Sequence, residues 1–261
     1  MTGNPLLSTR KLSVDIRGKR ILDNCSLDIN SGEVLSFLGP NGAGKSSFLK
    51  AIAGDLSADG EISVGNRRLN DISSAERARA ISVMPQRSSL RFAFSVREVL
   101  AMGRIPHSTG NKVDALIVSE VAEAMDLAGF MDKPYTQLSG GEQQRVQFAR
   151  ALVQVWRSAD SDYRLILLDE PTSSLDLKHQ IRALKVLKEL AASGVAVVAV
   201  LHDINLALHY SDRTALFANG QLVEAGASEE VINAKRLSSL FHVELEMHQS
   251  AGTGRPSLVP L

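Results

Sequence analysis

The sequence predicts an α/β fold with a parallel sheet as its core, an antiparallel β-subdomain at the N-terminus and an inserted α-helical subdomain. Three observations lead to this prediction. In the second half of the chain, short apolar segments alternate with helical ones, which is typical of parallel strands covered by helices on both faces. Near the N-terminus, two segments with alternating apolar and polar residues flank a turn. Between these blocks, roughly residues 87–155 have helical patterns.

The N-terminal part begins with a predicted β-hairpin. Leu12, Val14 and Ile16 alternate with polar residues, and the alternation resumes over Cys25–Ile29 after a turn at Arg17–Lys19. The elements expected next are an apolar strand over Glu33–Leu38, a helix from near Lys45 to Gly54, and strands over Glu61–Val64 and Ile81–Met84.

The inserted block contains two helix-capping patterns. Ser95 and Glu98 form one capping box, and Ser139 and Glu142 form a second, because each serine precedes a glutamate by three residues. The first box should open a short helix and the second a helix that reaches about Trp156. A third helix is expected from the periodicity of Lys112–Leu127, which continues up to Gly129.

In the last third of the chain, strands and helices alternate again. The expected elements are a buried strand over Leu165–Leu168, a helix over Leu177–Ala192, a buried strand over Val195–Leu201, a helix over Ile204–Tyr210 capped by Asp203, and a hairpin turn at Asn219–Gly220. We therefore expect one domain over residues 1–261. Residues 1–86 and 156–248 would form the sheet-containing core with its β-subdomain, 87–155 the helical subdomain, and the polar segment 249–261 a loosely ordered tail.

Composition narrows the possible functions. The 29 basic and 29 acidic residues give zero net charge, which removes the electrostatic case for a nucleic-acid partner. The single Cys25 excludes a disulfide framework and a CxxC site. The longest apolar run, Val195–Leu201, is too short to span a bilayer, and Met1–Pro5 does not resemble a secretion signal. A soluble protein in a reducing cytoplasm is expected.

The stretch Gly39–Ser46 fits the phosphate-loop pattern G-x-x-x-x-G-K-[ST] at every fixed position. Its glycines allow backbone N–H groups to face a phosphate at the start of the next helix. Lys45 can reach the β- and γ-phosphates of ATP, and the hydroxyl of Ser46 can bind Mg²⁺. An ordinary glycine-rich turn is the alternative, but a strand before and a helix after favour a P-loop NTPase core. The residues expected to contact ATP here are Gly39, Pro40, Asn41, Gly42, Ala43, Gly44, Lys45, Ser46 and Ser47.

Two carboxylates end the apolar strand that follows Arg164. In open α/β sheets, ligands bind at the carboxyl edge, where Asp169 and Glu170 should lie. Asp169 suits a role around Mg²⁺, and Glu170 can polarise the water that attacks the γ-phosphate. Alone, such a pair would usually be a solvated strand end. Its combination with the phosphate loop favours the functional interpretation.

The segment Leu138–Arg145, with the sequence LSGGEQQR, resembles the signature motif of ATP-binding-cassette (ABC) ATPases. Physically it is a capped helix N-terminus with two glycines, where backbone N–H groups can meet an anion. A merely well-capped helix is the alternative interpretation. The resemblance implies a RecA-like core and contacts from Ser139, Gly140, Gly141 and Glu142 to ATP.

Further segments resemble motifs of this family, in the family's order. Gln86 resembles the Q-loop glutamine, which senses Mg²⁺ and joins the helical subdomain to the core. Ser173–Asp176 resembles the D-loop, so Asp176 is implied at the dimer interface. His202 resembles the switch histidine that contacts the γ-phosphate. One departure concerns Ile16, which stands about where many relatives stack an aromatic residue on adenine. Apolar contact should then replace stacking, and ATP and GTP should compete on fairly even terms.

The resemblance covers roughly residues 8–245 and implies an ATPase that works as a head-to-tail homodimer with two ATP sites, each using ATP and Mg²⁺. Phe92–Glu98 followed by Gly103–His107 resembles the importer ATPases for iron chelates, cobalamin and haem. The link Val153–Arg164 and the stretch Thr172–Gln180 look like haem-import ATPases of Gram-negative bacteria.

The implied partners are two copies of a transmembrane permease and a periplasmic substrate-binding protein, with this chain peripheral on the cytoplasmic face of the bacterial inner membrane. Four arginines against one acid in residues 87–104 suggest a surface for the permease, formed by Arg87, Arg91, Arg97 and Arg104. The alternatives are a ferric-siderophore or cobalamin importer, an efflux ATPase, which Gly103–His107 argues against, and a soluble ABC ATPase with no permease.

Overall fold

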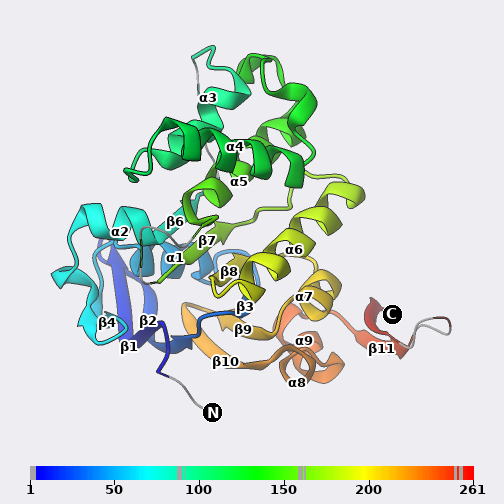
Figure 1. Cartoon of the computed structure of the whole chain (residues 1–261). Coiled ribbons are helices and arrows are strands. Elements are labelled where there is room, and N and C mark those ends of the chain that lie inside the picture. Colours follow the sequence, from blue (N-terminus) through cyan, green and yellow to red (C-terminus); the bar gives the residue numbers. More distant parts are fainter. Residues whose placement is uncertain are drawn as a thin grey trace.

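The computed structural model describes residues 4–86, 90, 92–157, 161, 163–249, 252 and 255–261. Its core is a six-stranded sheet in the order β10-β9-β3-β8-β7-β6 (Figure 1). Strands β6, β7, β8, β3 and β9 are parallel, and β10 is antiparallel to β9. The bounds are β3 Val34–Leu38, β6 Ile81–Met84, β7 Leu165–Asp169, β8 Ala196–Val200, β9 Arg213–Ala218 and β10 Gln221–Ala227. The predicted parallel sheet is confirmed.

Both faces of this sheet are covered. Strands β3, β7 and β8 are buried along their whole length, because successive side chains point into two separate apolar clusters. On one face, Phe37 packs against Phe48 of α1 (Lys45–Ala53) and Phe217, with ring centroids 5.5 and 4.9 Å away. Helices α6 (Leu177–Ala192) and α7 (Ile204–Tyr210) contribute to the other face. The apolar runs of the sequence therefore mark these strands correctly.

The predicted N-terminal hairpin is also confirmed, and it is longer than the alternation suggested. Strands β1 (Leu7–Ile16) and β2 (Lys19–Ile29) pair antiparallel and form a four-stranded sheet with β4 (Asp59–Val64) and β5 (Arg67–Arg68). Helix α2 (Ser74–Ala80) was not predicted. The hydroxyl of Ser73 caps this helix by accepting from the N–H of Glu76 at 3.2 Å, so the spacing Ser73-x-x-Glu76 was an available signal.

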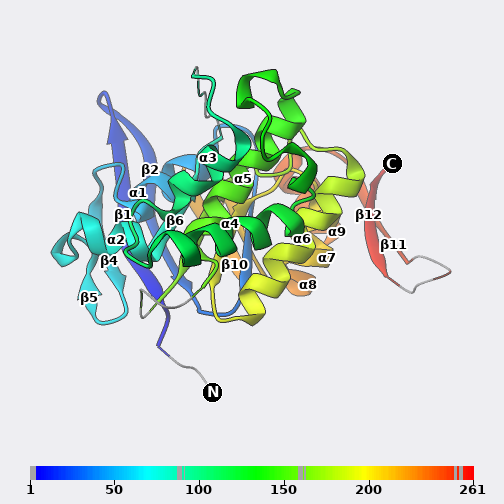
Figure 2. The same cartoon turned by 45° about the horizontal axis from the view of Figure 1, so that its top comes forward.

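Three helices form the part of the chain that lies above the sheet in Figure 1: α3 (Val96–Ala101), α4 (Asn111–Ala124) and α5 (Gly140–Val155). Figure 2 shows α5 behind α4 and next to the strands. One apolar cluster extends from these helices to the sheet, so the helical part shares its core with the strands. Helix α4 ends three residues before the predicted Leu127, because Asp126 adopts a left-handed conformation with φ +59°. Of the helices in the described ranges, none combines the length and apolar composition that crossing a bilayer requires.

The C-terminal segment differs from the loosely ordered tail expected for residues 249–261. After α8 (Ser228–Val231) and α9 (Ala234–Phe241), strands β11 (Leu245–Gln249) and β12 (Pro256–Pro260) form a two-stranded antiparallel sheet. Leu258 is buried, and its backbone N–H and C=O bind the side chain of Asn205 at 2.7 and 3.0 Å. The tail thus gains order from α7, a partner 53 residues away in the sequence.

Candidate nucleotide-binding site

The phosphate loop joins β3 to α1 and leaves the start of α1 free of a side-chain cap. Its N-cap residue is Gly44, in a left-handed conformation with φ +103°. By contrast, α5 and α6 are capped by the side chains of Ser139 and Asp176. The N–H groups at the start of α1 therefore remain available for a phosphate. Gly39 is required for close packing, because a Cβ at this position would lie 2.0 Å from the carbonyl oxygen of Phe217.

Lys45 lies at the centre of this loop. Its side chain is buried, and its Nζ donates to the carbonyl oxygens of Gly39 and Pro40 at 2.6 and 2.8 Å. Burial lowers the pKa of Lys45, although the charges of Glu170 and Asp169 oppose this shift. A desolvated ammonium held by two neutral carbonyls gains much from an anion nearby.

Ser46 and Asp169 lie where the first turn of α1 meets the end of β7. The hydroxyl of Ser46 donates to Asp169 Oδ1 at 2.9 Å, although the two residues are 123 positions apart. Burial raises the pKa of Asp169 despite this hydrogen bond. The structure thus brings together the hydroxyl and the carboxylate that the sequence assigned to the same ion.

Glu170 is the next residue after β7, and its carboxylate contacts two other predicted site residues. Its Oε1 lies 2.8 Å from Nε2 of His202, and Gln86 also hydrogen-bonds to the carboxylate. Burial alone would raise the pKa of Glu170, but the hydrogen bonds from His202 and Gln86 lower it overall. The carboxylate is therefore ionised at neutral pH.

One cavity unites the phosphate loop with Gln86, Glu170 and His202. It has a volume of about 560 Å³, within the range of small-molecule sites. It is lined by Lys19, Ile21, Asn41, Gly42, Ala43, Gly44, Lys45, Ser46, Ser47, Gln86, Glu170 and His202. The β1–β2 hairpin therefore contributes Lys19 and Ile21 to the cavity, and no role was predicted for either residue. Ile16, at the end of β1, is 39% exposed.

The signature residues lie elsewhere in the same chain. Ser139 caps α5 in the predicted box: its N–H and hydroxyl both donate to Glu142 Oε2 at 2.7 Å. Gly140 lines a second cavity, of about 380 Å³, together with Gln86 and Gln144. Asp176 caps α6 by accepting from the N–H of His179 at 2.9 Å, and its Oδ1 also lies 2.7 Å from Nδ1 of the same histidine.

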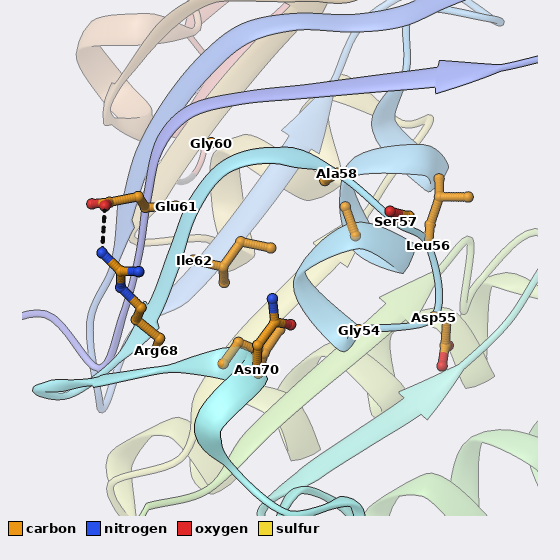
Figure 3. A pocket seen from close by; sticks show the side chains of 12 residues that line it. Gly54, Asp55, Leu56, Ser57, Ala58, Gly60, Glu61, Ile62, Arg68 and Asn70 are labelled. Carbon is orange, nitrogen blue, oxygen red and sulfur yellow. Dashed lines mark hydrogen bonds and ion pairs between the residues drawn. The ribbon is translucent and has the colours of Figure 1, made fainter.

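A third cavity, of about 340 Å³, lies between the end of α1 and β4 (Figure 3). Gly54, Asp55 and Ser57 line one part of it. Glu61 and Arg68 form an ion pair at 3.1 Å at another part, and both side chains are largely exposed. Because no phosphate-loop residue lines this cavity, it is not the nucleotide site.

The structure corrects the predicted arginine surface. Arg87 and Arg91 lie outside the described residues. Arg97 is exposed and pairs with Asp132 at 3.3 Å. Arg104 is buried, so its assignment to a docking surface is wrong.

The guanidinium of Arg104 holds the loop after α3 against the end of α5. Its Nε donates to Asp114 Oδ1 at 2.8 Å and one Nη to the carbonyl oxygen of Val153 at 3.2 Å. Nε2 of His107 lies 2.8 Å from the carbonyl oxygen of Gln154. These groups satisfy carbonyls at the C-terminus of α5 that have no partner within the helix. Gly103 allows this approach, because a Cβ there would lie 2.4 Å from the carbonyl oxygen of Arg150.

We expect Arg104→Ala to lower the free energy of unfolding by about 3 kcal/mol, because it removes a buried side chain together with its hydrogen bonds to Asp114, Thr109 and the Val153 carbonyl. The matched control is Arg97→Ala, whose exposed pair should contribute at most about 0.5 kcal/mol. Urea unfolding at neutral pH measures both changes. Equal effects of the two substitutions would contradict a buried structural role for Arg104.

Comparison with known proteins identifies the family. The ABC transporter family model matches residues 22–173, more than half of the chain. The hemin import ATP-binding protein HmuV of Pseudomonas aeruginosa is 41% identical over 255 residues, covering 97% of this chain and 99% of the relative. HmuV of Escherichia coli O157:H7 is 39% identical over 256 residues, with 97% and 99% covered.

Solved structures agree with this result. A metal-chelate type ABC transporter in an inward-facing conformation aligns with a TM-score of 0.81 at 28% identity, covering 99% of this chain and 98% of that one. An ATP-binding cassette of an ABC transporter in its ADP conformation, at 24% identity, shares the fold with a TM-score of 0.77, covering 91% and 97%. The resemblance inferred from Leu138–Arg145 is thereby confirmed. The chain belongs to the ABC transporter family.

Proposed function

We propose that this chain is the ATP-hydrolysing subunit of a bacterial importer whose cargo is haem. The observation that carries the proposal is similarity along nearly the whole chain to proteins named hemin import ATP-binding protein. These include the Pseudomonas aeruginosa protein and that of Gloeobacter violaceus, which is 41% identical over 259 residues. No residue in this chain is assigned to haem itself, because the permease and the binding protein would select the cargo.

The residues that line the 560 Å³ cavity indicate how ATP would be bound and hydrolysed. The free N–H groups of α1 and the ammonium of Lys45 would hold the phosphates of ATP. The ionised carboxylate of Glu170 would accept a hydrogen bond from the attacking water and orient it toward the γ-phosphorus. His202, at 2.8 Å from this carboxylate, would hold it in place and contact the γ-phosphate.

The residues at the end of β7 fit Mg²⁺, which prefers oxygen ligands. Ser46 and Asp169 bring a hydroxyl and a carboxylate oxygen to within 2.9 Å of each other, and burial raises the pKa of the Asp169 carboxyl. We propose that these two residues hold Mg²⁺ with the help of Gln86. When bound, the ion would neutralise charge on the phosphates.

The separation of the motifs supports a homodimer. Lys45 and Gly140 line different cavities of the same chain, so the phosphate loop and the signature segment do not line one site within a single subunit. In a head-to-tail arrangement, Ser139, Gly140, Gly141 and Glu142 of one subunit would complete the ATP site of the other, with Asp176 at the interface. Two identical sites follow from the two-fold symmetry.

Import requires membrane partners, which we propose to be two permease subunits and a periplasmic substrate-binding protein. The chain would associate peripherally with the cytoplasmic face of the bacterial inner membrane through the permease. The same chemistry would serve a ferric-siderophore or cobalamin importer, so the cargo needs a direct test.

The test uses the chain in complex with the permease encoded by a neighbouring gene, reconstituted in proteoliposomes. We expect the haem-loaded binding protein to stimulate ATP hydrolysis several-fold and to drive haem uptake. The same vesicles with cobalamin or a ferric siderophore provide the controls. Stimulation by cobalamin or the ferric siderophore instead of haem would overturn the assignment of haem as the cargo. If the chain hydrolyses ATP but binds no permease, the proposal that it is an importer subunit is overturned.

A further inference from the structure

We propose that Gln144, on the signature helix α5, is a positioning residue that holds Glu170 of its own chain in the geometry needed for hydrolysis. This inference rests on the proposed role of Glu170. The resemblance to the signature motif implies no role for Gln144. It lies two residues after Glu142, on the part of α5 that faces the turn after β7.

Both the nitrogen and the oxygen of the Gln144 side-chain amide form hydrogen bonds. Its Nε2 donates to the carbonyl oxygen of Glu170 at 2.9 Å and to the hydroxyl of Ser173 at 3.2 Å. Its Oε1 accepts from the N–H of Ser174 at 2.9 Å. Because a backbone carbonyl can only accept and a backbone N–H can only donate, the orientation of the amide is determined by its partners. The Gln144 amide satisfies the carbonyl of Glu170 and the N–H of Ser174 at the same time.

The backbone that Gln144 contacts is in an unfavourable conformation. Glu170 has φ +55°, in the left-handed region that a side chain with a Cβ rarely adopts. Such a conformation persists where surrounding contacts enforce it. The carbonyl oxygen of Glu170 accepts from Gln144 and also from the hydroxyl and N–H of Ser173, at 3.2 and 3.4 Å. These contacts fix the residue whose carboxylate meets His202.

The packing around this amide leaves little room for adjustment. A Cβ at Gly141 would lie 2.8 Å from the carbonyl oxygen of Ser174, so the first turn of α5 lies directly against this segment. A shift of α5 would therefore move Ser174 and, through Gln144, the carbonyl of Glu170. In the proposed homodimer, the start of α5 meets the partner's ATP. Gln144 would thus connect that contact to the water-orienting carboxylate of its own subunit.

Two substitutions and one matched control test the inference in the permease-bound protein. Gln144→Ala removes all three of these hydrogen bonds, and the isosteric Gln144→Glu turns the donor to Glu170 into an acceptor. Gln154→Ala is the control on the same helix, since Nε2 of Gln154 donates to the Ala78 and Ile81 carbonyls at 2.5 and 3.0 Å, away from the signature segment. We expect kcat to fall about tenfold in both Gln144 variants while KM for ATP changes little. The control should keep the wild-type kcat.

Mixed dimers, each purified through two different tags, identify the site on which Gln144 acts. When one subunit of the dimer carries Glu170→Gln, one of the two ATP sites still has its Glu170 carboxylate. With Gln144→Ala in the same subunit as Glu170→Gln, that remaining site keeps its own Gln144 and its activity. With the two changes in opposite subunits, the remaining activity should fall about tenfold. The reverse pattern would mean that Gln144 acts on the partner's ATP and would overturn the inference.

The outcomes separate this inference from the proposed function. A wild-type kcat in Gln144→Ala and Gln144→Glu, with active wild-type protein, overturns the role of Gln144 alone. A permease-bound wild-type protein that does not hydrolyse ATP overturns both. If Gln144→Ala unfolds at a lower temperature than the wild type, the isosteric Gln144→Glu decides the matter. A parallel rise in KM would also count against positioning.

Discussion

Glu170→Gln is expected to bind ATP and to lose about 10²- to 10⁴-fold in hydrolysis, the range that a positioned general base contributes. The substitution keeps the shape of the side chain and removes the negative charge. The wild-type carboxylate is ionised at neutral pH because hydrogen bonds from His202 and Gln86 overcome the effect of burial on its pKa. An amide in this place cannot draw a proton from the attacking water. The variant should therefore accumulate as an ATP-bound dimer.

Size-exclusion chromatography with saturating ATP and Mg²⁺, together with phosphate release by the permease complex, measures this result. The matched control is Glu189→Gln, which makes the same chemical change at an exposed position on α6. A Glu170→Gln protein that hydrolyses ATP within threefold of this control would show that another group orients the water. A purely monomeric variant would contradict the head-to-tail arrangement.

The sequence predicted well those elements whose determinants are local. Strand β6 and helices α6 and α7 have the predicted bounds, because apolar runs and capping residues such as Asp203 fix where each begins and ends. The end of α4 was wrong because a single left-handed residue, Asp126, stops the helix while the apolar periodicity continues. Strand β12 was missed because it is held by pairing with β11 and by the side chain of Asn205, and its own residues lack an alternating apolar pattern.

For the candidate site, motif spacing identified most of the groups that the fold brings together. Ser46 and Asp169 are in contact, and Glu170, His202 and Gln86 line the same cavity as Lys45. Sequence alone could not find the burial of Arg104, because counting charges treats every arginine as a surface residue. It also could not show how Gln144 is used, since its partners are main-chain groups of a distant turn.

Lys45→Ala is expected to abolish ATP hydrolysis and to weaken ATP binding while the protein stays folded. The ammonium is the cation placed where phosphate charge develops, and loss of one such group typically costs about 10²- to 10³-fold in rate. Folding should tolerate the change, because the hydrogen bonds of the Lys45 Nζ go to carbonyls of its own loop. The substitution also removes the free-energy cost of burying the Lys45 ammonium, the same desolvation that lowers the pKa of this group.

Lys50→Ala is the matched control for this prediction, since Lys50 is an exposed lysine on the same helix. It should bind and hydrolyse ATP as the wild type does, and thermal unfolding should show similar midpoints for all three proteins. Calorimetric titration with ATP separates weaker binding from slower chemistry. Wild-type turnover by Lys45→Ala in the permease complex would show that the phosphates bind elsewhere. Because Ser46, Asp169, Glu170 and His202 were assigned around the same phosphates, their roles would then fail together.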